Sequence, residues 1–164
     1  MARSRAAPAA ALAFVVVYWG AMAILHARAE GAAAESARSV AERGGEVLLG
    51  VAAMPTLADP TGWRVVFETD RAHYRHELSL TGGGATTPER FAKLGTAEAE
   101  LVERARRERE DARVFLGFAR FPAARLAGSG CAAATVIQLA DLRFTTPGAA
   151  GRGGNFAIEL PAAP

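Results

Sequence analysis

An aspartate and two arginines are the side chains of this chain best placed to do chemistry. Asp141 lies two residues before Arg143 within residues 134–144, a stretch that is otherwise apolar (ATVIQLADLRF) and reads as a strand. Side chains two apart share one face of a strand, so these two can belong to one polar network. Arg120 lies among phenylalanines and could reach that network. Two roles remain open for the trio, a contact to an anion or substrate and an ion pair that fixes a helix to a sheet.

The three histidines do not form a metal-ligand pattern. His26 lies next to an apolar N-terminal stretch, and His73 and His76 are three apart in a predicted strand. Strand residues three apart point to opposite faces, so this pair cannot hold one ion, and a zinc site needs three or four convergent ligands. We therefore expect both to be solvated strand residues and no metal to be bound. Glu68 and Glu77 could face one another across a hairpin, and ordinary surface charge is the simpler interpretation.

Composition excludes several further functions. Arginine and lysine total 19 against 17 acidic residues, and the net charge of +2 is too small to predict a nucleic-acid partner. The single cysteine, Cys131, excludes an internal disulfide framework. The glycine-rich stretches at 82–84 and 151–154 do not precede a helix of the phosphate-binding type, so both are predicted turns. We expect no cofactor held by this chain alone.

The stretch Ala6–Leu25 determines where the rest of the chain lies relative to a membrane. It contains twenty uncharged residues, which as a helix span about 30 Å, the thickness of a bilayer's hydrocarbon core. Arg3 and Arg5 precede it, and Ala27-Arg28-Ala29 resembles a signal-peptidase site. The apolar stretch is longer than a signal-peptide core, and a helical pattern continues beyond it. We therefore predict a retained single-pass anchor, with a secreted small binding domain cleaved near Ala29 as the alternative.

The remaining pattern predicts an α+β fold, in which a small antiparallel-sheet domain with two or three helices follows the transmembrane helix. We assign residues 1–26 to the membrane segment, 27–54 to a helical connector and 55–164 to a soluble α+β domain. Within that domain a loop is expected at 54–62, and a helix start is expected at Thr87-Pro88-Glu89. The other predicted elements are strands at 63–68, 73–80, 134–144 and 155–160, and helices at 96–113 and 114–121.

Several short motifs occur in an order that resembles the C-terminal part of the bacterial membrane-bound metal-dependent hydrolase family. They are Pro55 with Asp59-Pro60-Thr61-Gly62-Trp63-Arg64-Val65-Val66, then Tyr74, Arg120-Phe121-Pro122 and Asp141-Leu142-Arg143-Phe144. The resemblance implies location in the inner (plasma) membrane and a divalent metal held by histidine-rich motifs of the H-H-R-x-x-T-H-S type. This sequence contains no such motif, so no ligand carries over to it. We therefore expect a hydrolase-like tail without the metal centre, with the lipid bilayer and a histidine-rich membrane protein as partners.

Overall fold

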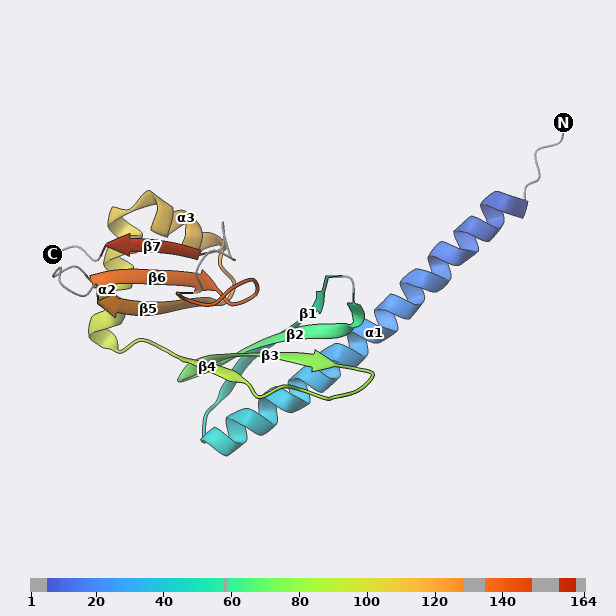
Figure 1. Cartoon of the computed structure of the whole chain (residues 1–164), viewed down its shortest axis with the longest axis horizontal. Coiled ribbons are helices and arrows are strands. Elements are labelled where there is room, and N and C mark those ends of the chain that lie inside the picture. The colour runs from blue at the N-terminus through green and yellow to red at the C-terminus, as the bar shows by residue number, and fades with distance from the viewer. Residues whose placement is uncertain (1–5, 58, 129–134, 149–156, 162–164) are drawn as a thin grey trace.

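A computed structural model describes residues 6–57, 59–128, 135–148 and 157–161. Arg3, Arg5 and Cys131 lie outside the described residues. A long N-terminal helix runs from the tip of the molecule to one face of a first sheet, and a second sheet with two helices lies beyond the other face (Figure 1). The predicted α+β class is therefore confirmed, with two antiparallel sheets. The elements are α1 (Ala6–Gly44), β1 (Leu48–Thr56), β2 (Asp59–Thr69), β3 (Ala72–Ser79), β4 (Glu89–Ala92), α2 (Thr96–Glu108), α3 (Glu110–Phe118), β5 (Pro122–Gly128), β6 (Thr135–Asp141) and β7 (Ala157–Pro161).

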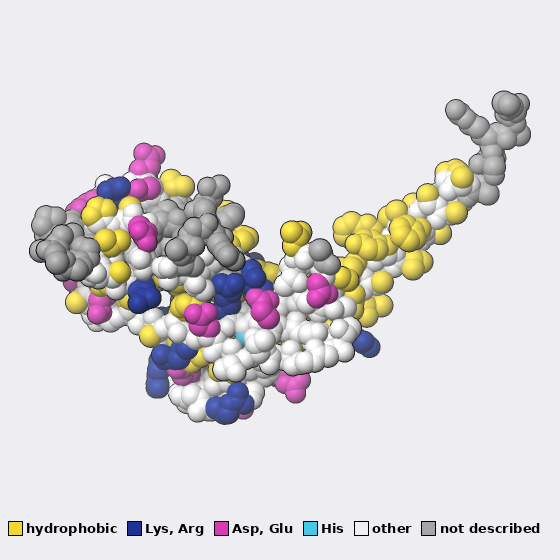
Figure 2. All heavy atoms as spheres, in the orientation of Figure 1, with side chains coloured by type: hydrophobic (Ala, Val, Ile, Leu, Met, Phe, Trp, Pro, Cys, Tyr) yellow, Lys and Arg dark blue, Asp and Glu magenta, His cyan; other side chains and the backbone are white. Residues whose placement is uncertain are grey.

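Helix α1 is 39 residues long, and its two halves have different surroundings. The first half carries large apolar side chains that project from the molecule (Figure 2), with Phe14 71% and Trp19 68% exposed. Among the described residues it is the one helix long and apolar enough to cross a membrane. In the second half Ala29, Ala33 and Ala37 are completely buried against sheet A, the sheet formed by β1–β4. A spacing of four residues keeps these alanines on one side of the helix.

The predicted helical connector to residue 54 is wrong beyond Gly44. Gly45 has a φ of 61°, its N–H donates to the Glu42 carbonyl, and the Glu46 N–H donates to the Ala41 carbonyl. This is a Schellman motif, in which a left-handed glycine satisfies the last carbonyls of a helix. The chain then reverses direction, and strand β1 runs back along α1.

Sheet A is a meander with the strand order β1-β2-β3-β4. The expected strands at 63–68 and 73–80 are present as β2 and β3, but the expected loop at 54–62 is largely strand. Pro55 pairs opposite Trp63 on the edge strand β1, where a residue without an N–H is tolerated. The expected helix start at Thr87-Pro88-Glu89 is also wrong, since β4 pairs with β3 over residues 89–92.

The second half of the domain pairs two helices with sheet B, whose strand order is β5-β6-β7. The predicted helix 96–113 is interrupted at Arg109, which has extended backbone angles and separates α2 from α3. This break allows Ala105 of α2 and Phe115 of α3 to pack in one core with Leu139 of β6. Sequence analysis did not predict β5, and the strand expected to reach Phe144 ends at Asp141.

Candidate functional site

Asp141 lies at the end of β6 and is completely buried. Its Oδ2 accepts hydrogen bonds from Arg143 Nη2 at 2.6 Å and Arg143 Nε at 2.9 Å. The same oxygen accepts from the Arg120 backbone N–H at 3.1 Å, and Oδ1 accepts from the Arg143 backbone N–H at 3.1 Å. The structure therefore brings the predicted trio together. Arg120 joins through its backbone N–H, and the residue as a whole is exposed to solvent.

The Arg143 side chain lies between the end of α3, at Phe118, and the segment after β6, at Phe144. Its guanidinium carbon is 5.2 Å from the Phe118 ring centroid and 5.0 Å from that of Phe144, and Nη2 donates to the Phe118 carbonyl at 3.4 Å. The Arg143 carbonyl in turn accepts from Arg64 Nη1 of sheet A at 3.2 Å. This arrangement ties the end of α3, the end of β6 and sheet A together.

The ionised form of Asp141 is favoured by these bonds. Burial acts to raise the pKa of this carboxyl, but the Arg143 side chain and the backbone N–H groups of Arg143 and Arg120 outweigh it. The pKa of Asp141 is therefore below its ordinary value. A buried carboxylate with this many donors is suited to holding structure together.

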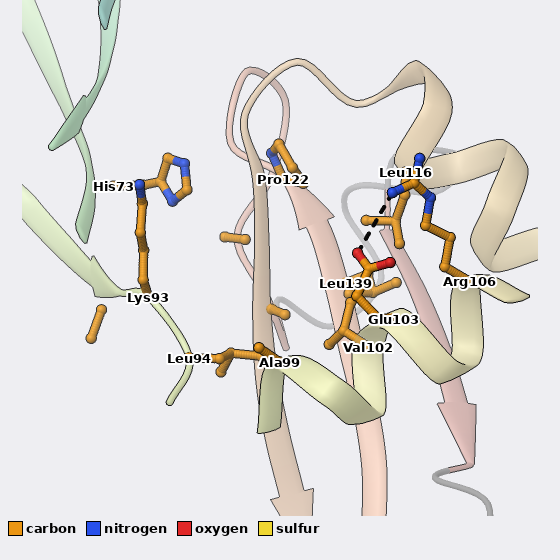
Figure 3. Close-up of a pocket in the computed structure, with 13 residues that line it drawn as sticks. His73, Lys93, Leu94, Ala99, Val102, Glu103, Arg106, Leu116, Pro122 and Leu139 are labelled. Atoms are coloured by element: carbon orange, nitrogen blue, oxygen red, sulfur yellow. Dashed lines mark ion pairs between the residues drawn. The ribbon is translucent and has the colours of Figure 1, made fainter. Parts of the chain in front are cut away.

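A cavity of about 310 Å³ lies between the two sheets (Figure 3). His73 of β3 and Lys93, which follows β4, lie on one side of it, while Glu103 and Arg106 of α2 lie on the other. Its volume is at the lower end of the range for small-molecule sites, and apolar walls with a few polar groups are typical of them. The apolar lining residues are Ala92, Leu94, Ala99, Val102, Leu116, Pro122, Ala123, Ala124 and Leu139.

On the side of sheet A, the lining residues His73 and Lys93 form a polar group with Glu68, which lies behind them. Glu68 Oε1 is 2.6 Å from Lys93 Nζ and 3.7 Å from His73 Nε2, and the His73 side chain is 12% exposed. Burial lowers the pKa of His73, Glu68 opposes this, and Lys93 adds to it. At neutral pH this wall therefore presents a neutral imidazole beside a paired ammonium group, while Glu103 and Arg106 form an ion pair on the opposite wall.

A second polar group lies just beyond the C-terminal end of α1, around the Glu46 side chain. The Glu46 side chain is 5% exposed and accepts from Thr69 Oγ1 at 2.6 Å, from Tyr74 Oη at 3.1 Å and from Arg90 Nη2 at 3.0 Å. The hydrogen bond from Thr69 is the largest reason that the Glu46 pKa is lowered. Sequence analysis missed this group, because its four members come from the turn after α1 and from the strands β2, β3 and β4.

The expectation of solvated strand histidines is wrong for His76. It is 3% exposed, and neither ring nitrogen has a hydrogen-bond partner, as is also true of Trp63 Nε1. Burial lowers the pKa of His76, against opposing effects of Glu77 and the Thr86 backbone. The signal was present in the sequence, because Tyr74 and Leu78 alternate with His76 and mark that face of β3 as the buried one.

The remaining candidates are separate from one another. Glu68 pairs with His73 and Glu77 with Arg64 across the strands, so the two glutamates do not oppose one another. His26 lies on α1, where its Nε2 is 3.2 Å from Glu30 Oε1. Within the described ranges, no three or more His, Cys, Asp or Glu side chains converge as a metal site would require.

Comparisons with models of protein families, with curated proteins and with solved structures gave no match to this chain.

Proposed function

We propose that this chain is a single-pass protein of the inner (plasma) membrane that presents an accessory domain next to the bilayer. The observation that carries this proposal is the continuity of α1 through two different environments. From Ala7 to Ile24 the residues are uncharged and, apart from the partly buried Met22, exposed, whereas Ala29 begins the half that sheet A covers. A bilayer would cover the first half as sheet A covers the second.

The secreted alternative requires cleavage near Ala29, and the motif Ala27-Arg28-Ala29 favours it. Ala29, however, is completely buried in the folded domain, and Leu25 packs on the same core. The His26 ring also lies 5.3 Å from the Trp63 ring. Cleavage there would remove Leu25 and His26 from contacts that stabilise sheet A, which supports a retained helix.

The accessory role rests on the resemblance to hydrolase tails. In this proposal a histidine-rich membrane protein supplies the divalent metal centre, and this chain contributes its domain to the complex. Arg120, Asp141 and Arg143 then act in holding the domain together, since their contacts are directed inward. The cavity beside His73 and Lys93 is the place where a small ligand would bind.

The anchor is tested by fractionating cells that express the chain with a C-terminal tag and measuring the intact mass of the product. We expect the full-length mass in the carbonate-resistant membrane pellet. A soluble product beginning at Glu30 would overturn the anchor and favour the secreted binding domain.

The accessory role is tested on chain purified in detergent. We expect no stoichiometric zinc or other divalent metal by elemental analysis, and co-purification of a histidine-rich membrane protein from native membranes. One tightly bound metal per isolated chain would contradict the proposal that the partner, and not this chain, holds the metal.

A further inference from the structure

The tip of the β1–β2 hairpin carries an apolar side chain with no protein cover. Leu57 is 99% exposed, the highest value among the large apolar residues that the structure describes. A single exposed leucine is ordinary on a protein surface, so its exposure alone does not indicate a partner. The position of this turn relative to the anchor indicates what covers it.

The hairpin points toward the apolar half of α1. Strand β1 begins just after α1 ends and runs back along it, so the turn after Thr56 lies on the side from which the anchor projects (Figure 1). Trp63, paired with Pro55, touches the ring of His26. Residues between this pair and the turn therefore lie beyond His26, at the level where the uncharged stretch of α1 begins.

The residues on either side of the turn are held in place by local hydrogen bonds. Asp59 Oδ1 accepts from the Thr61 N–H and from Thr61 Oγ1, both at 2.8 Å, and Thr56 Oγ1 donates to the Gly62 carbonyl at 3.0 Å. A Cβ on Gly62 would lie 2.6 Å from Asp59 Oδ2 and 2.8 Å from Thr56 Oγ1, so a larger residue would have to displace these two side chains. The Leu80 N–H also donates to the Thr61 carbonyl at 3.0 Å. These bonds fix the strand ends on either side of Leu57.

We propose that the β1–β2 hairpin is a second membrane contact, in which Leu57 enters the headgroup region of the bilayer that α1 crosses. This inference rests on the proposed anchor. Transfer of an exposed leucine from water into the interface is favourable, and the adjacent helix already holds the hairpin at the surface. The occupant is thus lipid, and the contact orients the domain about the axis of α1.

The same turn limits how deeply the hairpin enters. Hydrogen bonds from the Thr61 backbone and hydroxyl lower the pKa of Asp59, so this carboxyl is ionised at neutral pH. An ionised carboxylate is costly to place in hydrocarbon, so Asp59 keeps the turn at headgroup depth. A shallow contact is therefore expected.

The test uses the full chain with Cys131→Ser and one new cysteine carrying an environment-sensitive fluorophore, reconstituted into vesicles of phosphatidylcholine and phosphatidylglycerol. The three sites are Leu57→Cys, Val17→Cys in the apolar half of α1, and Val114→Cys on α3, which is 62% exposed. Spin-labelled lipids quench at headgroup depth or deep in the acyl chains. We expect a blue shift at Leu57 with stronger shallow than deep quenching, deep quenching at Val17, and neither at Val114.

The outcomes separate the two proposals. Deep quenching at Val17 with a Leu57 signal like that of Val114 would overturn the hairpin contact and leave the anchor standing. A blue shift at Leu57 that no lipid quencher reduces would mean a protein contact and would also overturn it. Absence of quenching at Val17 would overturn the anchor, and with it the hairpin contact.

Discussion

The two faces of sheet A are covered by different kinds of contact. On the α1 face, Ala29, Ala33 and Ala37 lie directly against Trp63 and Phe67, and all five are at most 1% exposed. On the opposite face a smaller apolar cluster around Val66 and Phe121 is accompanied by the polar network of Arg64, Asp141 and Arg143.

This difference shows what each face depends on. The α1 face depends on shape, because alanine lets a helix approach the sheet closely enough for large aromatic residues to fill the remaining space. It tolerates unpaired ring nitrogens on Trp63 and His76. The opposite face depends on charge, since Asp141 is buried with its oxygens paired. Substitutions that change volume should therefore damage the first face, and substitutions that change charge should damage the second.

The largest effect is expected from Asp141→Ala. Removal of the carboxylate leaves Arg143 without its ion pair and two backbone N–H groups without their acceptor, so the free energy of unfolding should fall by about 3–5 kcal/mol. Urea unfolding in detergent, followed by Trp63 fluorescence in a Trp19→Phe background, measures this. Asp141→Asn, which keeps the shape, should cost less. A loss below about 1 kcal/mol for the alanine variant would mean that this face does not depend on charge.

The next effect is expected on the α1 face from Ala33→Leu. Ala33 is completely buried, so the added carbons have no space and should lower the free energy of unfolding by about 1–3 kcal/mol. Ala21→Leu is the matched control, because Ala21 is exposed on the other half of the same helix. Equal unfolding curves for the two variants would contradict the close packing of α1 on sheet A.

His76→Leu should stabilise the domain at pH 7 by about 1 kcal/mol, since it replaces a buried group without hydrogen bonds by an apolar one. It should also flatten the dependence of stability on pH. Burial puts the folded-state pKa of His76 below its unfolded value near 6.5, so the unfolded chain binds the proton more readily. The stability that neutral His76 allows is complete above about pH 6.5 and is lost as pH falls below it.

Urea unfolding at pH 7.5 and pH 5.5 measures this difference. His73→Leu is measured for comparison, because burial also lowers the pKa of His73, and the two variants together show how much of the pH dependence each histidine carries. If His76→Leu loses as much stability between the two pH values as the unchanged chain does, His76 is not the titrating group.

The smallest effects are expected from Arg64→Gln and, below it, Glu108→Gln. The first change removes a partly exposed ion pair with Glu77 at 2.9 Å and the hydrogen bond to the Arg143 carbonyl, together worth about 1 kcal/mol. Glu108→Gln removes the exposed pair with Arg104 on α2 and should change stability by only a few tenths of a kcal/mol. The same unfolding measurement ranks the two, and a larger loss for Glu108→Gln would reverse the proposed order.

The elements with strong side-chain patterns could be predicted from the sequence. The segment Trp63–Glu68 is rich in aromatic and β-branched residues, which predicts a strand, and β2 contains it. Ala6–Leu25 is apolar throughout, which predicts the membrane-length helix. Strands β1 and β5 could not be predicted in this way. They are rich in alanine and glycine and each contains a proline, so pairing with neighbouring strands, rather than intrinsic preference, makes them extended.

The candidate sites were predictable only in part. Asp141 and Arg143 are close in sequence, and their pairing follows from spacing and charge. Arg120 joins them through a backbone N–H, which side-chain type does not reveal. The cavity requires β4 and α2 to face one another, so the meeting of Lys93 and Arg106 around one space depends on tertiary structure.

The absence of a break in α1 gives the domain a lever. About 30 Å of the same helix lies on each side of His26, so a change in helix tilt within the bilayer rotates the whole domain. A tilt of about 20°, typical of membrane helices, would move the far end of this half of the helix sideways, parallel to the membrane, by roughly 10 Å. Bilayer thickness would thus set the lateral position and orientation of the domain over the membrane, and a membrane partner at a fixed lateral position would be reached in one lipid environment and missed in another.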